Sequence, residues 1–236
     1  STGFQPTAVI PADYSAVFRE ERVAISRLDD ELRSTLEIVV ATEDDGELRR
    51  VSLSNEGSRD REIELTSYAE LVLAPHRADL AHPAFSNLFV RTDFDPPSGA
   101  LLATRRPRNP SEAPVWAVHV LSTAAATRLE YETDRARFIG RDRNARSALT
   151  IESGRPLSNT TGSVLDPIFS LRTRVTVAPG ATVRVTFSTL VTDSREQALA
   201  LGRDSNRYRL ARDVVSGADR HCRGDMKAYR AGELER

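Results

Sequence analysis

Residues 61–74 alternate between apolar and polar side chains almost without interruption. The side expected to be buried carries Ile63, Leu65, Ser67, Ala69, Leu71 and Leu73. The opposite side carries Glu62, Glu64, Thr66, Tyr68, Glu70 and Val72. Alternation with a period of two predicts a long strand with one buried face, as in antiparallel sheets. The chain around it must therefore supply further strands and a second layer to cover that face.

Shorter alternating runs recur along the chain and are separated by turn-forming residues. The Asp45-Gly46 pair supplies the left-handed backbone geometry of a tight hairpin turn. Two polar segments, 76–86 and 141–164, are predicted to be irregular loops. Many short strands with few helical periods predict an all-β sandwich. The strands are expected at 14–18, 23–28, 32–42, 48–53, 61–74, 88–92, 100–104, 115–121, 127–133, 170–177 and 182–191.

Composition fits one sandwich-sized domain of 236 residues. The net charge is -1, with 33 Lys and Arg against 34 Asp and Glu, which argues against a nucleic-acid partner. Cys222 is the only cysteine, so neither an intrachain disulfide nor a cysteine metal cluster can form. No apolar run approaches the roughly 20 residues that span a bilayer. We therefore expect a cytoplasmic protein without a structural metal.

The C-terminal region differs in composition from the rest of the chain. Cys222, Met226 and Lys227 are the only Cys, Met and Lys, and they lie within a few residues of each other. Ser194 is expected to cap a helix with Glu196 in its first turn. We therefore divide the chain into a sandwich at 1–192 and, at 193–236, a linker helix with a poorly ordered tail. The tail is interpreted either as a divergent linker or as a non-native sequence such as a frameshift, and the chain as a piece of a longer protein.

No residue pattern in the chain is typical of a catalytic or metal site. The four histidines, His76, His82, His119 and His221, show no spacing typical of metal ligands. His119 alternates with apolar neighbours and is predicted to be a hydrogen-bonded sheet residue rather than a base. Neither a nucleophile elbow nor a phosphate-cradling glycine loop is found. We therefore predict no catalytic residue and no cofactor.

Several motifs occur together in a fixed order. The most specific is YETDRARFIGR at 131–141; the others are ATRRPR at 103–108 followed by PVW at 114–116, TGSVLDPI at 161–168 and VAPG at 177–180. This ordered set resembles the N-terminal β-domain of glycoside hydrolase family 94, formerly glycosyltransferase family 36. The likeness covers roughly residues 4–201 and is greatest to the cyclic β-1,2-glucan synthetase and cellobiose phosphorylase-like branch.

The resemblance implies a galactose-mutarotase-like super-sandwich that is not itself catalytic. In such phosphorylases the general acid is an Asp of the following α/α-barrel domain, and inorganic phosphate attacks from the opposite face. The implied partners are that barrel, a β-glucan or glucose-containing oligosaccharide, and a second copy of the chain, with the parent protein at the bacterial inner membrane. A free-standing carbohydrate-binding module and, less favoured, a mutarotase-like epimerase remain as alternatives.

Four residues are candidates for binding: Asp134, Arg135, Arg141 and Trp116. Asp134 either pairs with Arg135, Arg137 or Arg141 to pin a loop, or contacts sugar or phosphate across a domain interface. Trp116 either packs in a core or an interdomain contact, or offers its ring to a sugar.

A sandwich that covers a large partner should expose an apolar patch when it is isolated. The residues expected to contribute are Tyr68, Val72, Phe85 and Phe138. We therefore expect the isolated chain to self-associate.

Overall fold

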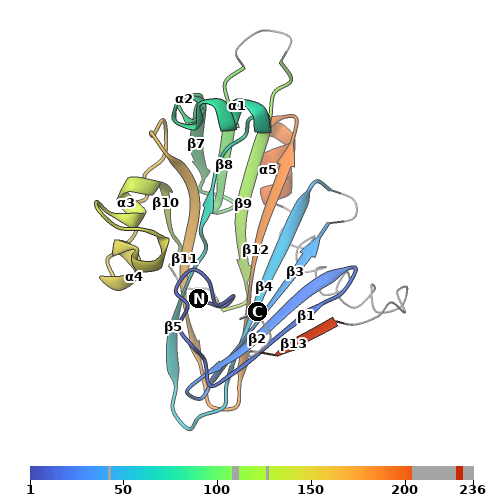
Figure 1. The fold of residues 1–236 in the computed structure, drawn as a ribbon, viewed down its shortest axis with the longest axis vertical. Helices are drawn as coiled ribbons and strands as arrows, with labels where there is room; N and C mark the ends of the chain where they lie inside the picture. The colour runs from blue at the N-terminus through green and yellow to red at the C-terminus, as the bar shows by residue number, and fades with distance from the viewer. Residues whose placement is uncertain (42–43, 108–111, 126–127, 204–226, 231–236) are drawn as a thin grey trace.

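The computed structural model describes residues 1–41, 44–107, 112–125, 128–203 and 227–230. Within this part, two antiparallel sheets face each other (Figure 1). The large sheet has the strand order β13-β1-β2-β3-β4-β12-β9-β8-β7, and the small sheet the order β10-β11-β5, with β6 also paired to β11. The predicted all-β super-sandwich is confirmed in its class and layering.

The strand positions follow the predicted runs closely. The strands are β1 (Asp13–Phe18), β2 (Arg22–Asp29), β3 (Leu32–Val40), β4 (Gly46–Asn55), β5 (Arg61–Thr66), β6 (Ala69–Glu70), β7 (Val90–Asp95), β8 (Ala100–Arg105), β9 (Trp116–Thr123), β10 (Glu130–Asp134), β11 (Pro167–Val177), β12 (Thr182–Thr192) and β13 (Lys227–Arg230). The helices are α1 (His76–Ala81), α2 (Pro83–Asn87), α3 (Arg135–Ile139), α4 (Leu149–Glu152) and α5 (Arg195–Arg203), with a 3₁₀ turn at Ala145–Ser147.

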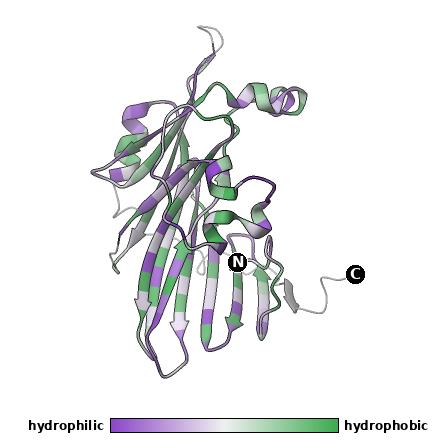
Figure 2. Cartoon of the chain, turned by 90° about the vertical axis from the view of Figure 1, so that its left-hand side faces the viewer, coloured by the Kyte–Doolittle hydropathy of each residue, from purple (hydrophilic) through white to green (hydrophobic). Residues whose placement is uncertain are grey.

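Apolar side chains fill the space between the two sheets. Hydrophobic and hydrophilic residues alternate along the strands of the large sheet (Figure 2), as expected for strands with one buried face. Leu53 and Val185 of the large sheet and Phe169 and Leu171 of the small sheet belong to this buried cluster. Burial of this area is the main contribution to the stability of the sandwich.

The long strand predicted at 61–74 is interrupted, which corrects the expectation. Pairing with β11 stops at Thr66 and resumes at Ala69. At the break, the Ser67 hydroxyl accepts a hydrogen bond from the Leu171 amide at 2.9 Å. A serine hydroxyl that hydrogen-bonds a backbone amide competes with the regular backbone hydrogen bonds between the two strands. The predicted inward face is nonetheless correct, since Leu65 and Leu71 are both buried.

The two segments predicted as irregular loops contain short helices, which is a second correction. Residues 76–86 form most of α1 and α2, and 141–164 contains the 3₁₀ turn and α4. Pro83 is the first residue of α2, a position where proline is favoured because its missing N–H has no helical partner. Because these segments are polar, their short helices were not predicted from the sequence.

The linker helix predicted after residue 192 is present as α5. The Ser194 hydroxyl accepts a hydrogen bond from the Gln197 amide at 3.2 Å, as an N-cap should. The helix packs on the outer side of the large sheet, where Ala198 is fully buried. Among the described residues, no helix has the length and hydrophobicity needed to cross a membrane.

The backbone of β13 pairs antiparallel with β1. The interpretation of residues 204–226 and 231–236 as a poorly ordered tail lies outside the described residues, as do Cys222, Met226 and His221.

His119 joins the two sheets through hydrogen bonds inside the core. Its Nε2 lies 2.9 Å from the Ser67 hydroxyl and its Nδ1 lies 2.9 Å from the Thr189 hydroxyl. Its ring is nearly parallel to the ring of Phe169, 5.7 Å away between centroids. Burial, aided by the positive charge of Arg49, lowers the pKa of His119 to about 4. The prediction of a hydrogen-bonded sheet residue is confirmed.

This burial makes the stability of the fold dependent on pH. The pKa of histidine in an unfolded chain is about 6.5. Between pH 6.5 and about pH 4, the unfolded state therefore binds more protons at His119 than the folded state does. The free energy of unfolding should therefore fall as pH is lowered through this window, by on the order of 3 kcal/mol from His119. Urea denaturation followed by Trp116 fluorescence at several pH values measures the loss.

The variant His119→Gln should flatten this pH dependence, since its amide does not titrate. His76→Gln, which changes an exposed histidine, is the matched control and should keep the full dependence. A slope that persists unchanged in His119→Gln would contradict the assignment.

Candidate functional site

The family-like motif at 131–141 forms the end of β10 and the helix α3. Asp134 is the N-cap of α3, and its Oδ1 accepts a hydrogen bond from the Ala136 amide at 2.9 Å. Its Oδ2 lies 3.5 Å from Nε of Arg137. Gly140 ends the helix with φ 87°, and a Cβ there would meet Leu149 at 2.9 Å. Asp134 therefore has the loop-pinning role, with Arg137 as its charged partner.

Arg135 contacts the small sheet rather than Asp134. Its Nε donates to Glu70 at 2.9 Å, and the Tyr68 hydroxyl donates to the same carboxylate at 2.7 Å. The hydrogen bond from Tyr68 is the largest cause of a lowered pKa of the Glu70 carboxyl, and the hydrogen bond from Arg135 is the second. Burial and the Glu70 carboxylate raise the pKa of Tyr68. The Tyr68 ring lies 5.0 Å from the buried ring of Phe138, so neither ring belongs to the expected free apolar patch.

The structure does not gather the four candidate residues into one site. Arg141 is exposed and makes no hydrogen bond or ion pair with any described residue. Trp116 begins β9 on the large sheet and is half-buried against the cluster beneath α5. Asp134 and Arg135 lie instead at the end of β10 in the small sheet. Trp116 thus packs on this cluster, and of the four candidates Arg141 is the one whose side chain has no contact of this kind with a described residue.

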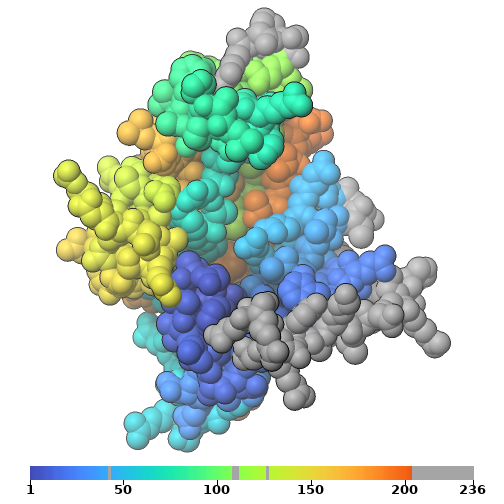
Figure 3. Space-filling model, in the orientation of Figure 1, coloured from blue at the N-terminus to red at the C-terminus, as the bar shows by residue number. Residues whose placement is uncertain are grey.

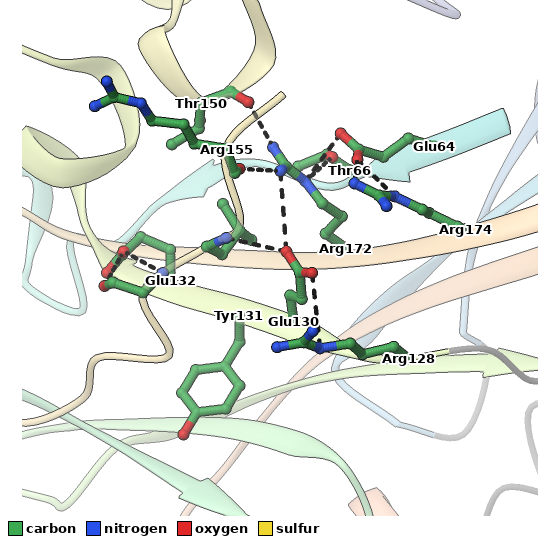
Figure 4. A network of polar contacts seen from close by, with 12 residues as sticks. Glu64, Thr66, Arg128, Glu130, Tyr131, Glu132, Thr150, Arg155, Arg172 and Arg174 are labelled. Atoms are coloured by element: carbon green, nitrogen blue, oxygen red, sulfur yellow. Dashed lines mark hydrogen bonds and ion pairs between the residues drawn. The ribbon is translucent and has the colours of Figure 1, made fainter. Parts of the chain in front are cut away.

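A network of polar contacts centres on Arg172 of β11, which sequence reasoning missed (Figure 4). Its side chain is 1% exposed. It donates to the backbone carbonyls of Arg155 at 2.7 Å and Thr150 at 3.0 Å. Its Nε lies 3.2 Å from a Glu64 carboxylate oxygen. Burial lowers the pKa of Arg172, although nearby carboxylates oppose that shift.

Two glutamates of β10 complete the network around the segment that follows α3. Glu130 accepts the Leu157 amide at 3.0 Å and lies 4.0 Å from Arg172. Glu132 accepts the Ser158 amide at 3.3 Å and also binds the Ser158 hydroxyl. We call Arg172, Glu130 and Glu132 the clasp, because they hold residues 150–158 against the small sheet. Glu130 is paired with Arg172, whereas Glu132 is held by hydrogen bonds from amides and a hydroxyl, and both arrangements offset the cost of burying a charge.

The sequence did contain a signal for the clasp. Arg172 interrupts the otherwise apolar and small-polar strand at 167–173, and a charge in such a run needs a buried partner. Glu130 and Glu132 alternate with Tyr131 along β10, so the two carboxylates lie on the same face of the strand. The loop partners of Arg172, which are 17 and 22 residues before it, could not be identified from spacing.

The clasp holds the segment at 150–158 in place by hydrogen bonds and ion pairs. Both glutamates accept hydrogen bonds from backbone amides, which fix the positions of their carboxylates. In the described part of the chain, no group of three His, Cys, Asp or Glu could hold a metal ion.

Loss of the clasp arginine should destabilise the fold. Arg172→Met removes the donor to two carbonyls and leaves Glu64 and Glu130 without their shared cation, so we expect a loss of about 3–5 kcal/mol. Arg174→Met is the matched control, because this half-exposed side chain binds Glu64 at the surface and should cost less than about 1 kcal/mol. Urea denaturation measures both. Equal losses would contradict the role of the clasp.

Comparisons with known proteins agree with the motif pattern. The family model of the supersandwich domain of glycosyl hydrolase 94 matches residues 1–207. Cyclic beta-(1,2)-glucan synthase NdvB of Rhizobium meliloti (strain 1021) is 39% identical over 194 residues, which is 81% of this chain and 7% of that protein. The chain thus spans a small fraction of the length of this curated relative.

Solved structures with some likeness include two carbohydrate-active proteins. A polysaccharide lyase has a TM-score of 0.43 and 9% identity, covering 82% of this chain and 27% of its own. A putative kojibiose phosphorylase from the human microbiome has a TM-score of 0.40 and 9% identity, and the likeness covers 86% of this chain and 25% of that chain. The family model, the curated relative and the two-sheet architecture lead to one conclusion: this chain belongs to the glycosyl hydrolase 94 supersandwich family.

Proposed function

We propose that the chain is a non-catalytic sandwich domain of a larger glycoside phosphorylase or cyclic β-1,2-glucan synthetase that acts on β-glucans. Membership of the glycosyl hydrolase 94 family and the glucan synthase name of the curated relative support this proposal. The proposed partner is the α/α-barrel catalytic domain of the parent protein. Inorganic phosphate is a proposed co-substrate of that parent protein. The proposed location of the parent protein is the cytoplasm, at the inner membrane.

The proposal rests mainly on one observation: the charged residues of the motif bind other residues of this same domain. Asp134 caps α3, Arg135 binds Glu70, and Glu132 accepts hydrogen bonds from Thr133, Asp134 and Ser158. A glycosidic acid must instead present a proton to the leaving oxygen. These carboxylates support the fold, which is what a scaffold domain requires.

Arg141 is the motif residue that we assign to contact beyond the domain. It follows the Gly140 turn, is exposed and has no described partner. A free guanidinium can bind a carboxylate, a phosphate or sugar hydroxyls. The proposed contact lies at the edge of a glucan site in the parent protein.

The two alternatives have less support. An epimerase needs a histidine and a carboxylate in one cleft, but His119 is buried between two hydroxyls. A free-standing carbohydrate-binding module would offer an exposed aromatic platform, whereas Trp116 packs beneath α5. No specific observation favours either alternative.

The chain alone should be inactive on glucans. Incubation with phosphate and a β-1,2- or β-1,4-linked glucan should release no glucose 1-phosphate, because the described carboxylates of the motif are engaged internally. Enzymatic quantification of glucose 1-phosphate measures this. Reproducible release that persists after repurification, and is lost in Asp134→Asn, would overturn the non-catalytic assignment.

The isolated chain should also bind free glucan weakly. Titration calorimetry with linear β-1,2-glucan should give no saturable binding tighter than about 1 mM, since a single free arginine supplies few contacts. Trp116 fluorescence should remain unchanged during the same titration. Micromolar affinity with a change in Trp116 fluorescence would instead favour the carbohydrate-binding module.

A further inference from the structure

Residues 1–10 lie between the strands β1 and β2 of the large sheet and the helices that cover the small sheet (Figure 1). Figure 3 shows this dark-blue segment beside the yellow lobe formed by residues 135–155. Two arginines reach the segment from opposite sides, Arg27 of β2 and Arg146 of the 3₁₀ turn. We call residues 1–10 the latch and residues 135–155 the lobe. The latch therefore connects the lobe to the large sheet.

Arg27 fixes one side of the latch from within the large sheet. Its side chain is 4% exposed. It donates to the backbone carbonyl of Ser1 at 2.5 Å and to that of Val9 at 3.3 Å. Both carboxylate oxygens of Asp29 accept from the same guanidinium at 2.6 Å. Because a buried charge is costly unless it is paired and hydrogen-bonded, Arg27 favours the latch conformation in which the two carbonyls meet it.

The latch backbone has a conformation that must be held by contacts from outside. Phe4 has φ 66° and Ala8 has φ 52°, a left-handed region that is costly for residues with a side chain. The Phe4 ring makes an edge contact with Tyr14 of β1, 6.2 Å away between centroids. Strained backbone persists only where the surrounding structure determines it. Loss of the Arg27 contacts should therefore let the latch relax away from the sheet.

Arg146 ties the other side of the latch to the lobe. Its Nε donates to the backbone carbonyl of Thr7 at 3.3 Å. Arg146 belongs to the 3₁₀ turn that Asn144 caps, five residues after Arg141. Both arginines of the latch bind main-chain carbonyls, so these contacts do not depend on the side chains of the latch.

We propose that the latch is a conformational device that holds residues 141–147, and Arg141 with them, against the large sheet, and that opening of the latch frees these residues. In the closed state Arg27 anchors the latch and the latch anchors Arg146. In the open state residues 141–147 keep only contacts within the lobe, such as the bond from Arg143 to the Ser147 carbonyl. The importance of Arg141 rests on the proposed function. The latch itself is a property of the isolated chain, so its test can fail while the proposed function stands.

Hydrogen exchange followed by mass spectrometry tests the large-sheet side of the latch. Arg27→Met should raise exchange at least fivefold in peptides from residues 1–10, and about threefold in peptides from 141–147, because local opening exposes the amides of both. Arg50→Met is the matched control, since it also removes an arginine that pairs with a carboxylate of the large sheet, Glu37, and should change neither segment. Exchange in β12 reports global unfolding and should stay unchanged.

The lobe side of the latch has its own pair of variants. Arg146→Met should raise exchange at 141–147 about threefold, because it removes the bond to the Thr7 carbonyl. Arg155→Met is the matched control. It changes an exposed arginine of the same lobe whose side chain points away from the clasp (Figure 4), and it should leave exchange at 141–147 unchanged.

The double variant Arg27→Met with Arg146→Met tests whether the two contacts act as one device. Opening the latch through Arg27→Met already removes the contact of Arg146, so the double variant should show no more exchange at 141–147 than Arg27→Met alone. Two independent contacts would instead multiply their separate effects. Unchanged exchange at 141–147 in Arg27→Met, or multiplied effects in the double variant, would each overturn the proposal.

Discussion

The packing of β11 between two layers is the constraint on which the rest of the structure depends. One face of this strand places Phe169, Leu171 and Val175 in the core shared with the large sheet. The other face places Ile168 under α3 and Arg172 under the loop that follows it. Because β11 is buried on both sides, it fixes the distance between the sheets and the position of the motif at 131–141. The sandwich and the clasp are therefore consequences of the same strand.

This arrangement explains why motif residues that look suited to chemistry serve the fold. A buried arginine is costly unless its donors and its charge are satisfied. Glu64, Glu130 and two backbone carbonyls satisfy Arg172, and in doing so they immobilise the loop. Arg141 and most of the α1–α2 hairpin lie outside the clasp and are exposed. A loop held firmly against the small sheet is consistent with the proposed role of the chain as one domain of a larger protein.

The sequence was sufficient to predict those structural features that depend on residues close together in the chain. Period-two alternation determines which face of a strand is buried, so the strand positions and the inward side of β5 were predictable. The Ser194 cap depends on a bond to the Gln197 amide three residues away, and it too was predictable. The ordered motifs identified the family. His119 was recognised as a sheet residue because its strand neighbours are apolar.

Only the tertiary structure decided the features that join distant residues. At the break, Ser67 binds the Leu171 amide, and the partly buried Tyr68 packs against Phe138, so strand alternation alone predicted a longer strand and a freer tyrosine. The partners of Arg172 lie on a loop whose path is set by the sheet beneath it. Sequence by itself thus determined the class, the layers and the family, because these follow from local periodicity and motif order. The clasp and the exposed hairpin were decided by three-dimensional packing, because their contacts join segments that are far apart in the chain.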